Sequence, residues 1–170
     1  MLLFLLACDP APPPPATPSF TLPSASSAAP VAADPRAAAD QAFNDAMQAF
    51  ETGQPTAGTA VPRAIAAYEA VGQLDTDGLF HLALLHLAAG DAKAARITSE
   101  QVLAQRPTHL LALASAGKAA TQLGDAAAAK GYYERLDAAF DAEQGKVPEY
   151  AHHAVLLPIY REEAKKALGK

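Results

Sequence analysis

The sequence of 170 residues has few of the residues that build several common kinds of site. Its single cysteine, Cys8, excludes an intrachain disulfide and a metal site made of several cysteines. It has no tryptophan, and only 18% of its residues are charged. Thirteen Lys and Arg against eighteen Asp and Glu give a formal net charge of −5, so nucleic acid is not expected as a partner. No apolar run approaches the roughly 20 residues that a membrane-spanning helix needs.

Motifs of catalysis are also missing. The chain has no phosphate-binding glycine loop and no nucleophile elbow. Its five histidines are not at metal-ligand spacings, because His81 and His86 are five residues apart and fall on different helix faces, and adjacent His152 and His153 also diverge. We expect these histidines, with His109, to be partly exposed polar tips on apolar helices. The sequence therefore predicts no enzymatic activity, metal ion, cofactor or small-molecule substrate, with a metal- or carboxylate-dependent helical hydrolase as the remaining alternative.

The first eight residues are a short apolar run that ends in a small residue before the cysteine. The sequence Leu5-Leu6-Ala7-Cys8 resembles the lipobox of bacterial lipoproteins, in which the cysteine is acylated and becomes the new N-terminus. The resemblance implies a signal segment over residues 1–8, lipid attachment at Cys8 and a periplasm-facing place in the bacterial cell envelope. The alternative is a cytoplasmic protein whose apolar start carries no lipid.

Residues 9–35 differ sharply in composition from the rest of the chain. They hold nine of the fourteen prolines, together with Ser, Thr and Ala, and contain no Lys, Arg or Gly. Four consecutive prolines, Pro12 to Pro15, favour extended polyproline II geometry. Because so little apolar surface cannot repay the entropy of ordering, we predict a disordered tether that spaces the membrane from a folded domain.

The remainder, residues 36–170, is predicted to be helical throughout. Apolar residues recur at helical spacing, and glycines and prolines separate the segments. Helices are expected over residues 36–52, 78–89, 110–123, 126–141 and 148–168. Two more are expected between these: one with Pro62 in its first turn, which follows the first helix, and one that ends before Pro107. The last of them should be kinked by Pro158 near residues 154–157. The helix over 78–89 is apolar on nearly every side, which predicts a place in the middle of a stack.

A pattern of 34 residues occurs twice in tandem. Gly90-Asp91-Ala92 recurs as Gly124-Asp125-Ala126, and the surrounding small and apolar positions recur with it. In the first copy these positions hold Leu79, Leu82, Ala83, His86, Gly90, Ala95, Ser99 and Pro107, and in the second Leu113, Ala116, Gly117, Ala120, Gly124, Ala129, Tyr133 and Asp141. Residues 76–141 thus resemble two tetratricopeptide (TPR) repeats, and residues 39–75 a diverged earlier one. The resemblance implies an all-α fold: a short α-solenoid of antiparallel helix pairs, about three repeats with a C-terminal capping helix.

The same resemblance implies a partner-binding groove. TPR folds bind peptides or partner helices in the concave surface lined by the first helix of each pair. Carrying those positions over gives Phe43, Met47, Phe50, Phe80, Leu84, Leu87, Lys118, Thr121 and Gln122. The apolar members could instead be buried in the core. The sequence is therefore interpreted as a lipid-anchored, non-enzymatic scaffold that binds another protein or peptide, with a soluble cytoplasmic TPR adaptor as the alternative.

Overall fold

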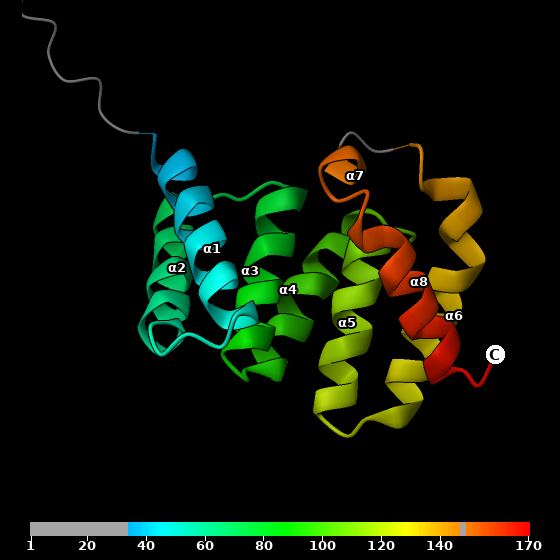
Figure 1. Cartoon of the computed structure of the whole chain (residues 1–170). Coiled ribbons are helices and arrows are strands. Elements are labelled where there is room, and N and C mark those ends of the chain that lie inside the picture. The colour runs from blue at the N-terminus through cyan, green and yellow to red at the C-terminus, as the bar shows by residue number, and fades with distance from the viewer. Residues whose placement is uncertain (1–33, 147–148) are drawn as a thin grey trace, which may run out of the picture. The chain divides into compact units, whose positions relative to one another are not determined.

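The computed structural model describes residues 34–146 and 149–170, which lie in one compact unit, Ala33–Lys170 (Figure 1). These residues form helices and no strand, which confirms the predicted all-α class. The helices are α1 (Pro35–Glu51), α2 (Ala57–Val71), α3 (Thr76–Ala88), α4 (Ala92–Gln105), α5 (Leu110–Gln122), α6 (Ala126–Glu143), α7 (Glu149–His152) and α8 (Leu156–Ala167). The signal-like segment 1–8 with Cys8, and all but the last two residues of the tether 9–35, lie outside the described part.

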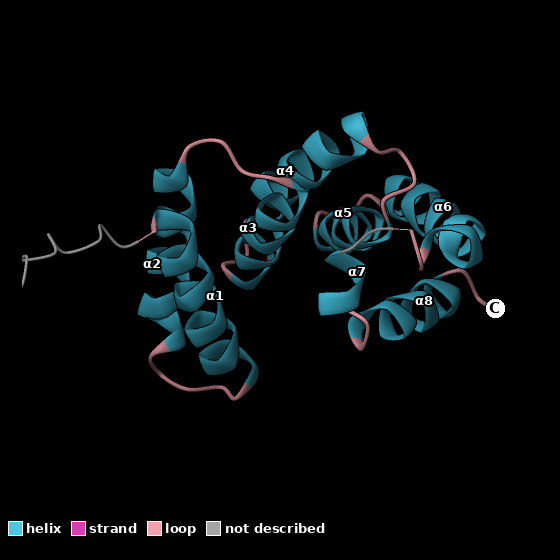
Figure 2. Cartoon of the chain, turned by 90° about the horizontal axis from the view of Figure 1, so that it is seen from above, coloured by secondary structure: helices cyan, strands magenta, loops and turns pink. Residues whose placement is uncertain are grey.

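The helices form three pairs followed by a C-terminal helix. The pairs α1–α2, α3–α4 and α5–α6 each pack tightly, and every pair packs against the next through α2 on α3, α4 on α5 and α6 on α8. The first helices also touch in order, α1 with α3, α3 with α5 and α5 with α8. Figure 2 shows this succession of helices from above. The architecture is the predicted short α-solenoid of about three repeats with a capping helix, in which α8 takes the place of a fourth first helix.

The repeated Gly-Asp dipeptide builds the turn inside each of the last two pairs. Gly90 and Gly124 have positive φ angles of 78° and 73°, a conformation in which a side chain would be strained. The amide of the following Asp then donates to a carbonyl of the finished helix, Asp91 to His86 and Asp125 to Ala120. Both aspartates also cap the next helix by accepting a hydrogen bond from an amide three residues later, at 3.0 Å. Two residues therefore end one helix, reverse the chain and begin the next.

The apolar interior has two parts that meet at α3. Phe80 belongs to the cluster built mainly by α4, α5, α6 and α8, whereas Leu82 and Leu85 belong to the cluster shared with α1 and α2. The central position predicted for this helix is thereby confirmed. Further along, Gly117 of α5 lies under the ring of Tyr133, and a methyl group added there would come within 2.5 Å of Cε1 of that ring. The repeat pattern predicts such a small residue where two helices cross.

Two predicted boundaries were wrong. Helix α2 begins at Ala57, so Pro62 lies inside the helix and residues 57–61, expected in a loop, are helical. The expected single kinked helix over 148–168 is two helices, α7 and α8, separated by residues 153–155. Pro158 is the third residue of α8, where a missing amide hydrogen breaks no intrahelical bond. The break contains Ala154, whose carbonyl would clash with the ring of Pro158 in a continuous helix, so it overlaps the kink expected near residues 154–157.

No helix among the described residues is long and apolar enough to span a bilayer.

Candidate functional site

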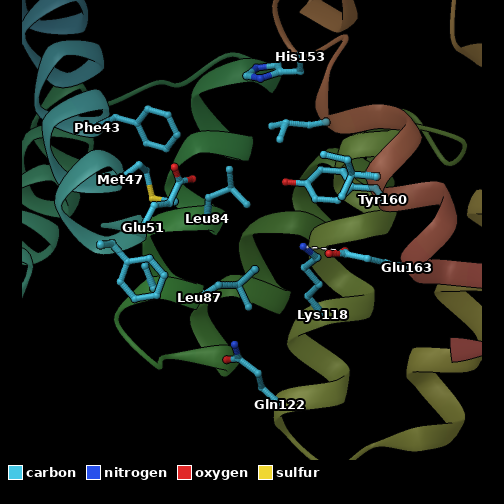
Figure 3. A pocket seen from close by; sticks show the side chains of 14 residues that line it. Phe43, Met47, Glu51, Leu84, Leu87, Lys118, Gln122, His153, Tyr160 and Glu163 are labelled. Atoms are coloured by element: carbon cyan, nitrogen blue, oxygen red, sulfur yellow. Dashed lines mark ion pairs between the residues drawn. The ribbon is translucent and has the colours of Figure 1, made fainter. Parts of the chain in front are cut away.

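A groove of about 450 Å³ runs along the first helices of the pairs. Its lining comes from α1, α3, α5 and α8, and from the segment between α7 and α8, as Figure 3 shows for the labelled side chains. The residues are Phe43, Met47, Phe50, Glu51, Leu84, Leu87, Ala88, Lys118, Gln122, His153, Leu156, Ile159, Tyr160 and Glu163. The groove is thus the concave surface that a TPR-like stack presents.

The α1 wall consists of apolar side chains on one helix face. Phe43, Met47 and Phe50 are separated by four and three residues, so all three face the groove. Phe43 is fixed by stacking on the His81 ring, with centroids 4.1 Å apart and planes 16° from parallel. Phe50, one helical turn beyond Met47, is 47% exposed. This wall therefore runs from a rigid aromatic stack to a solvent-exposed phenyl ring.

The floor is built by half-buried Leu84 and Leu87 of α3 and by Lys118 and Gln122 of α5. Lys118 is held by α8, because its ammonium lies 2.8 Å from the carboxylate of Glu163 and 4.4 Å from the centroid of the Tyr160 ring. Glu51 also lines the groove, so two carboxylates, Glu51 and Glu163, stand against the one ammonium group of Lys118. The groove therefore combines an apolar surface with a slight excess of negative charge.

The α8 wall was not among the residues predicted from the sequence. Leu156, Ile159, Tyr160 and Glu163 follow one another at spacings of three, one and three residues, and therefore share a face. Ile159 is 48% exposed, and Tyr160 is buried. The helical spacing of these residues was a usable signal, but this segment was interpreted as a polar cap and not as part of a groove.

The structure brings seven of the nine predicted groove residues together and places two elsewhere. Phe80 is only 1% exposed and packs in the core, and Thr121 lines a separate cavity of about 250 Å³ beside Tyr133. The helix geometry explains this, because Phe80 points into the core cluster built mainly by α4, α5, α6 and α8, and the Thr121 hydroxyl donates back to the carbonyl of Gly117 at 2.9 Å. The seven are Phe43, Met47, Phe50, Leu84, Leu87, Lys118 and Gln122. Their role in binding a partner stays a prediction.

The groove ends in a polar cluster around His153. The imidazole Nε2 of His153 lies 2.9 Å from Oδ1 of Asp77, and Nε2 of His81 lies 3.9 Å from the same oxygen. On the other side of its ring, Nδ1 of His81 lies 2.8 Å from the hydroxyl of Tyr68, which in turn bonds to Asp40. Side chains from α1, α2, α3 and the α7–α8 segment thus form one connected network.

Histidines are more deeply buried than the sequence led us to expect. His81 is 9% exposed and His109 1%, so neither is a partly exposed polar tip. Burial lowers the pKa of both imidazoles below the ordinary value, although the nearby carboxylates Asp77 and Glu149 oppose this shift. His109 caps α5 by accepting from the amide of Ala112 through Nδ1, which leaves Nε2 to donate to Glu149.

Asp77 keeps its negative charge in this network. Burial alone would raise the pKa of its carboxyl, but the hydrogen bond from His153 and the positive charge of nearby Arg36 help to outweigh burial, and the pKa is lowered. Arg36 lies 3.2 Å from the other oxygen of Asp77, and it also pairs with Asp40 and Asp75. Asp77 was not among the residues predicted from the sequence, although the four-residue spacing between Asp77 and His81 places both on one helix face.

Comparison with known proteins supports the fold. No protein-family profile matches the chain, and no curated protein matches it. Among solved structures, the chain resembles PcrH from Pseudomonas aeruginosa with a TM-score of 0.52 and 14% sequence identity, over 76% of this chain and 92% of that one. At this level of identity the likeness concerns the fold alone, a TPR-like helical repeat.

Proposed function

We propose that this protein is a non-enzymatic scaffold that binds a partner protein through a short helix or peptide seated in the concave groove. The observation that carries the proposal is the exposure of Phe50 and Ile159, which line the same groove from opposite walls at 47% and 48%. Large hydrophobic side chains that remain in water together, with polar groups at the rim, are typical of an interaction surface. The likeness to a TPR-like structure supports the same use of the groove.

The lining specifies the chemistry of the partner. Leu84, Leu87 and Met47 offer apolar contact area at the centre, where apolar anchors of a partner helix would be buried. Lys118 is already neutralised by Glu163, which leaves Glu51 to attract a cation. The expected partner segment is therefore amphipathic, with apolar side chains at helical spacing and a Lys or Arg beside them.

Site-specific crosslinking tests the groove. A photoreactive phenylalanine analogue would replace Phe50 or, as a matched control, Ile97 of α4, which is 58% exposed but does not line the groove. We expect a partner protein to be crosslinked from position 50 and not from position 97. A peptide of the crosslinked partner should then bind at least tenfold more weakly to Phe50→Ala/Ile159→Ala than to Ile97→Ala, because each hot-spot side chain contributes more than about 1 kcal/mol. Equal crosslinking, or equal affinity of the two variants, would contradict the proposal.

We further propose that the scaffold is anchored in the bacterial envelope by lipid attached to Cys8. The support is the lipobox-like sequence and the proline-rich stretch that separates it from the helical unit. Two or more acyl chains anchor a protein stably, because each buried methylene adds about 0.8 kcal/mol. Metabolic labelling with a fatty-acid probe should mark the wild type and not Cys8→Ser, and fractionation should place only the wild type in membranes. Unlabelled wild-type protein in the soluble fraction would refute the anchor and leave the groove proposal untouched.

A further inference from the structure

Three side chains with metal-binding atoms converge at the end of the groove. Asp77 and His81 lie one turn apart on α3, and His153 follows α7 directly. One ligand atom from each lies within 4.8 Å of the others. The separations from Oδ1 of Asp77 are 2.9 Å to His153 Nε2 and 3.9 Å to His81 Nε2. Ligands about 2.0–2.1 Å from a tetrahedral ion are about 3.3 Å apart, so the two distances bracket the required value.

The hydrogen bonds around the cluster orient its ligand atoms. The Tyr68 hydroxyl has one hydrogen, which it donates to the carboxylate of Asp40, so it accepts a hydrogen bond from Nδ1–H of His81. This fixes the tautomer of His81 and leaves a lone pair on Nε2, the atom that faces Asp77. A histidine whose second nitrogen donates to a held acceptor is the usual arrangement behind a metal ligand.

Packing and ion pairs hold the other ligands. Arg36 engages Oδ2 of Asp77 at 3.2 Å, which leaves Oδ1 for the histidines. The Phe80 ring stands edge-on to the His153 ring, with centroids 5.0 Å apart. Besides Asp77, Arg36 is paired with Asp40 and Asp75, so three carboxylates share one guanidinium and carry with it a formal net charge of about −2. A divalent cation would neutralise that charge.

We propose that Asp77, His81 and His153 form a binding site for a divalent transition-metal ion of the zinc type. Two imidazoles and one carboxylate suit zinc, whereas calcium and magnesium prefer sites made of oxygen atoms. The ion takes the place of the hydrogen between His153 and Asp77, and a three-ligand site keeps a fourth position for water or an external ligand. This proposal does not rest on the proposed binding of a partner in the groove, although His153 also lines that groove.

Zinc titration of the full chain in a Cys8→Ser background tests the site, since that background removes the only thiol. After dialysis against a chelator, we expect one Zn²⁺ per chain. His153→Ala, Asp77→Asn and His81→Gln should each weaken binding at least tenfold. Tyr68→Phe keeps the ring and removes the hydroxyl that positions His81, so binding should weaken by about 10–100-fold. The matched control is His152→Ala, because His152 is the exposed neighbour of His153, and its affinity should stay within twofold of the background.

A rescue separates ligation from folding. His153→Cys offers a thiolate, itself a good zinc ligand, and should restore one Zn²⁺ per chain where His153→Ala does not. Co²⁺ should give the visible absorption of a low-coordinate ion in the background protein, lose it in His153→Ala, and gain a sulfur-to-cobalt charge-transfer band in His153→Cys. Absence of stoichiometric Zn²⁺, or equal losses in His152→Ala and His153→Ala, would overturn the proposal. So would a Co²⁺ spectrum that does not change with the residue at position 153.

Discussion

Two helical glycines with different surroundings allow the packing of the last repeat to be tested. Gly117 in α5 is buried beneath the Tyr133 ring, where an added Cβ would lie 2.5 Å from Cε1 and 2.9 Å from Cδ1 and Cζ. Gly131 in α6 has no neighbouring atom within 4 Å of such a Cβ. The same substitution to alanine should therefore stabilise the protein at position 131 and give no gain, or a loss, at position 117.

The expected changes in the free energy of unfolding combine a gain in helix propensity with a cost of overpacking. Replacing a helical glycine by alanine stabilises a helix by about 1 kcal/mol, and both variants gain this term. Carbon atoms in contact prefer about 3.5–4.0 Å, so the methyl group at position 117 overlaps the ring by about 1 Å, and such overpacking costs about 1–3 kcal/mol. Tyr133 is only 7% exposed, and the free space that its ring borders is the cavity of about 250 Å³ beside Thr121. We expect Gly131→Ala to stabilise the protein by about 1 kcal/mol and Gly117→Ala to be about 1–3 kcal/mol less stable than Gly131→Ala.

Urea unfolding followed by far-UV circular dichroism measures both free energies, and the difference between the variants isolates the packing term. Adding Tyr133→Leu should remove most of the cost at position 117, because the clash involves ring atoms, and it should leave the gain at position 131 unchanged. If the two glycine variants gained the same stability, the helices would not cross as closely here as the structure shows.

Three further predictions concern stability. Burial lowers the pKa of His81 and His109, so the unfolded chain binds more protons than the folded one below about pH 6.5. The free energy of unfolding should therefore fall as the pH drops from 7 to 5.5, by at most about 1.4 kcal/mol per pH unit for each histidine. Urea titrations in the presence of a chelator measure this change, and a flat profile would contradict the prediction. Asp125→Ala should cost about 0.5–2 kcal/mol in thermal or urea unfolding by removing the cap of α6, whereas Asp125→Asn should cost little. Ser99 and Ser115 share a buried hydroxyl–hydroxyl bond of 2.7 Å, so Ser99→Ala should cost about 1 kcal/mol, and a double-mutant cycle with Ser115→Ala should show that the two losses do not add.

The repeat pattern allowed most of the fold to be predicted, because each of its positions requires a particular residue type, such as glycine in a tight turn or a small residue where two helices cross. The Gly-Asp dipeptides at 90–91 and 124–125 act as turns and caps in the structure, as their spacing indicates. The departures from the pattern also have a structural reason. Where the second repeat places Tyr133 against Gly117, the first places the smaller Ser99, whose hydroxyl bonds to Ser115 across the contact between α4 and α5.

Residues whose function depends on distant parts of the chain could not be found in this way. The local sequence around Phe80 does not reveal which face of α3 is covered by α5, and Thr121 differs from its neighbour Gln122 only in the direction in which it points. The approach of His153 to Asp77 joins residues 76 positions apart, and it requires a full break between α7 and α8, where only a kink in one helix was expected. Periodicity within one helix carries no information about such pairings.

The break at residues 153–155 connects the two proposed sites. It releases His153 from helical geometry so that the imidazole bonds to Asp77 on α3, and it allows α8 to restart with Leu156, Ile159 and Tyr160 on the groove side. An ion bound at His153 and a partner bound against α8 would therefore act on the same short segment. Thermodynamic linkage then requires reciprocity: if Zn²⁺ changes the affinity for the partner by some factor, the partner must change the affinity for Zn²⁺ by the same factor. Titrating Zn²⁺ with and without a saturating partner peptide, and the peptide with and without Zn²⁺, should give two equal factors that both collapse to one in His153→Ala. A factor other than one that survives this substitution would show that the coupling does not pass through the α7–α8 segment.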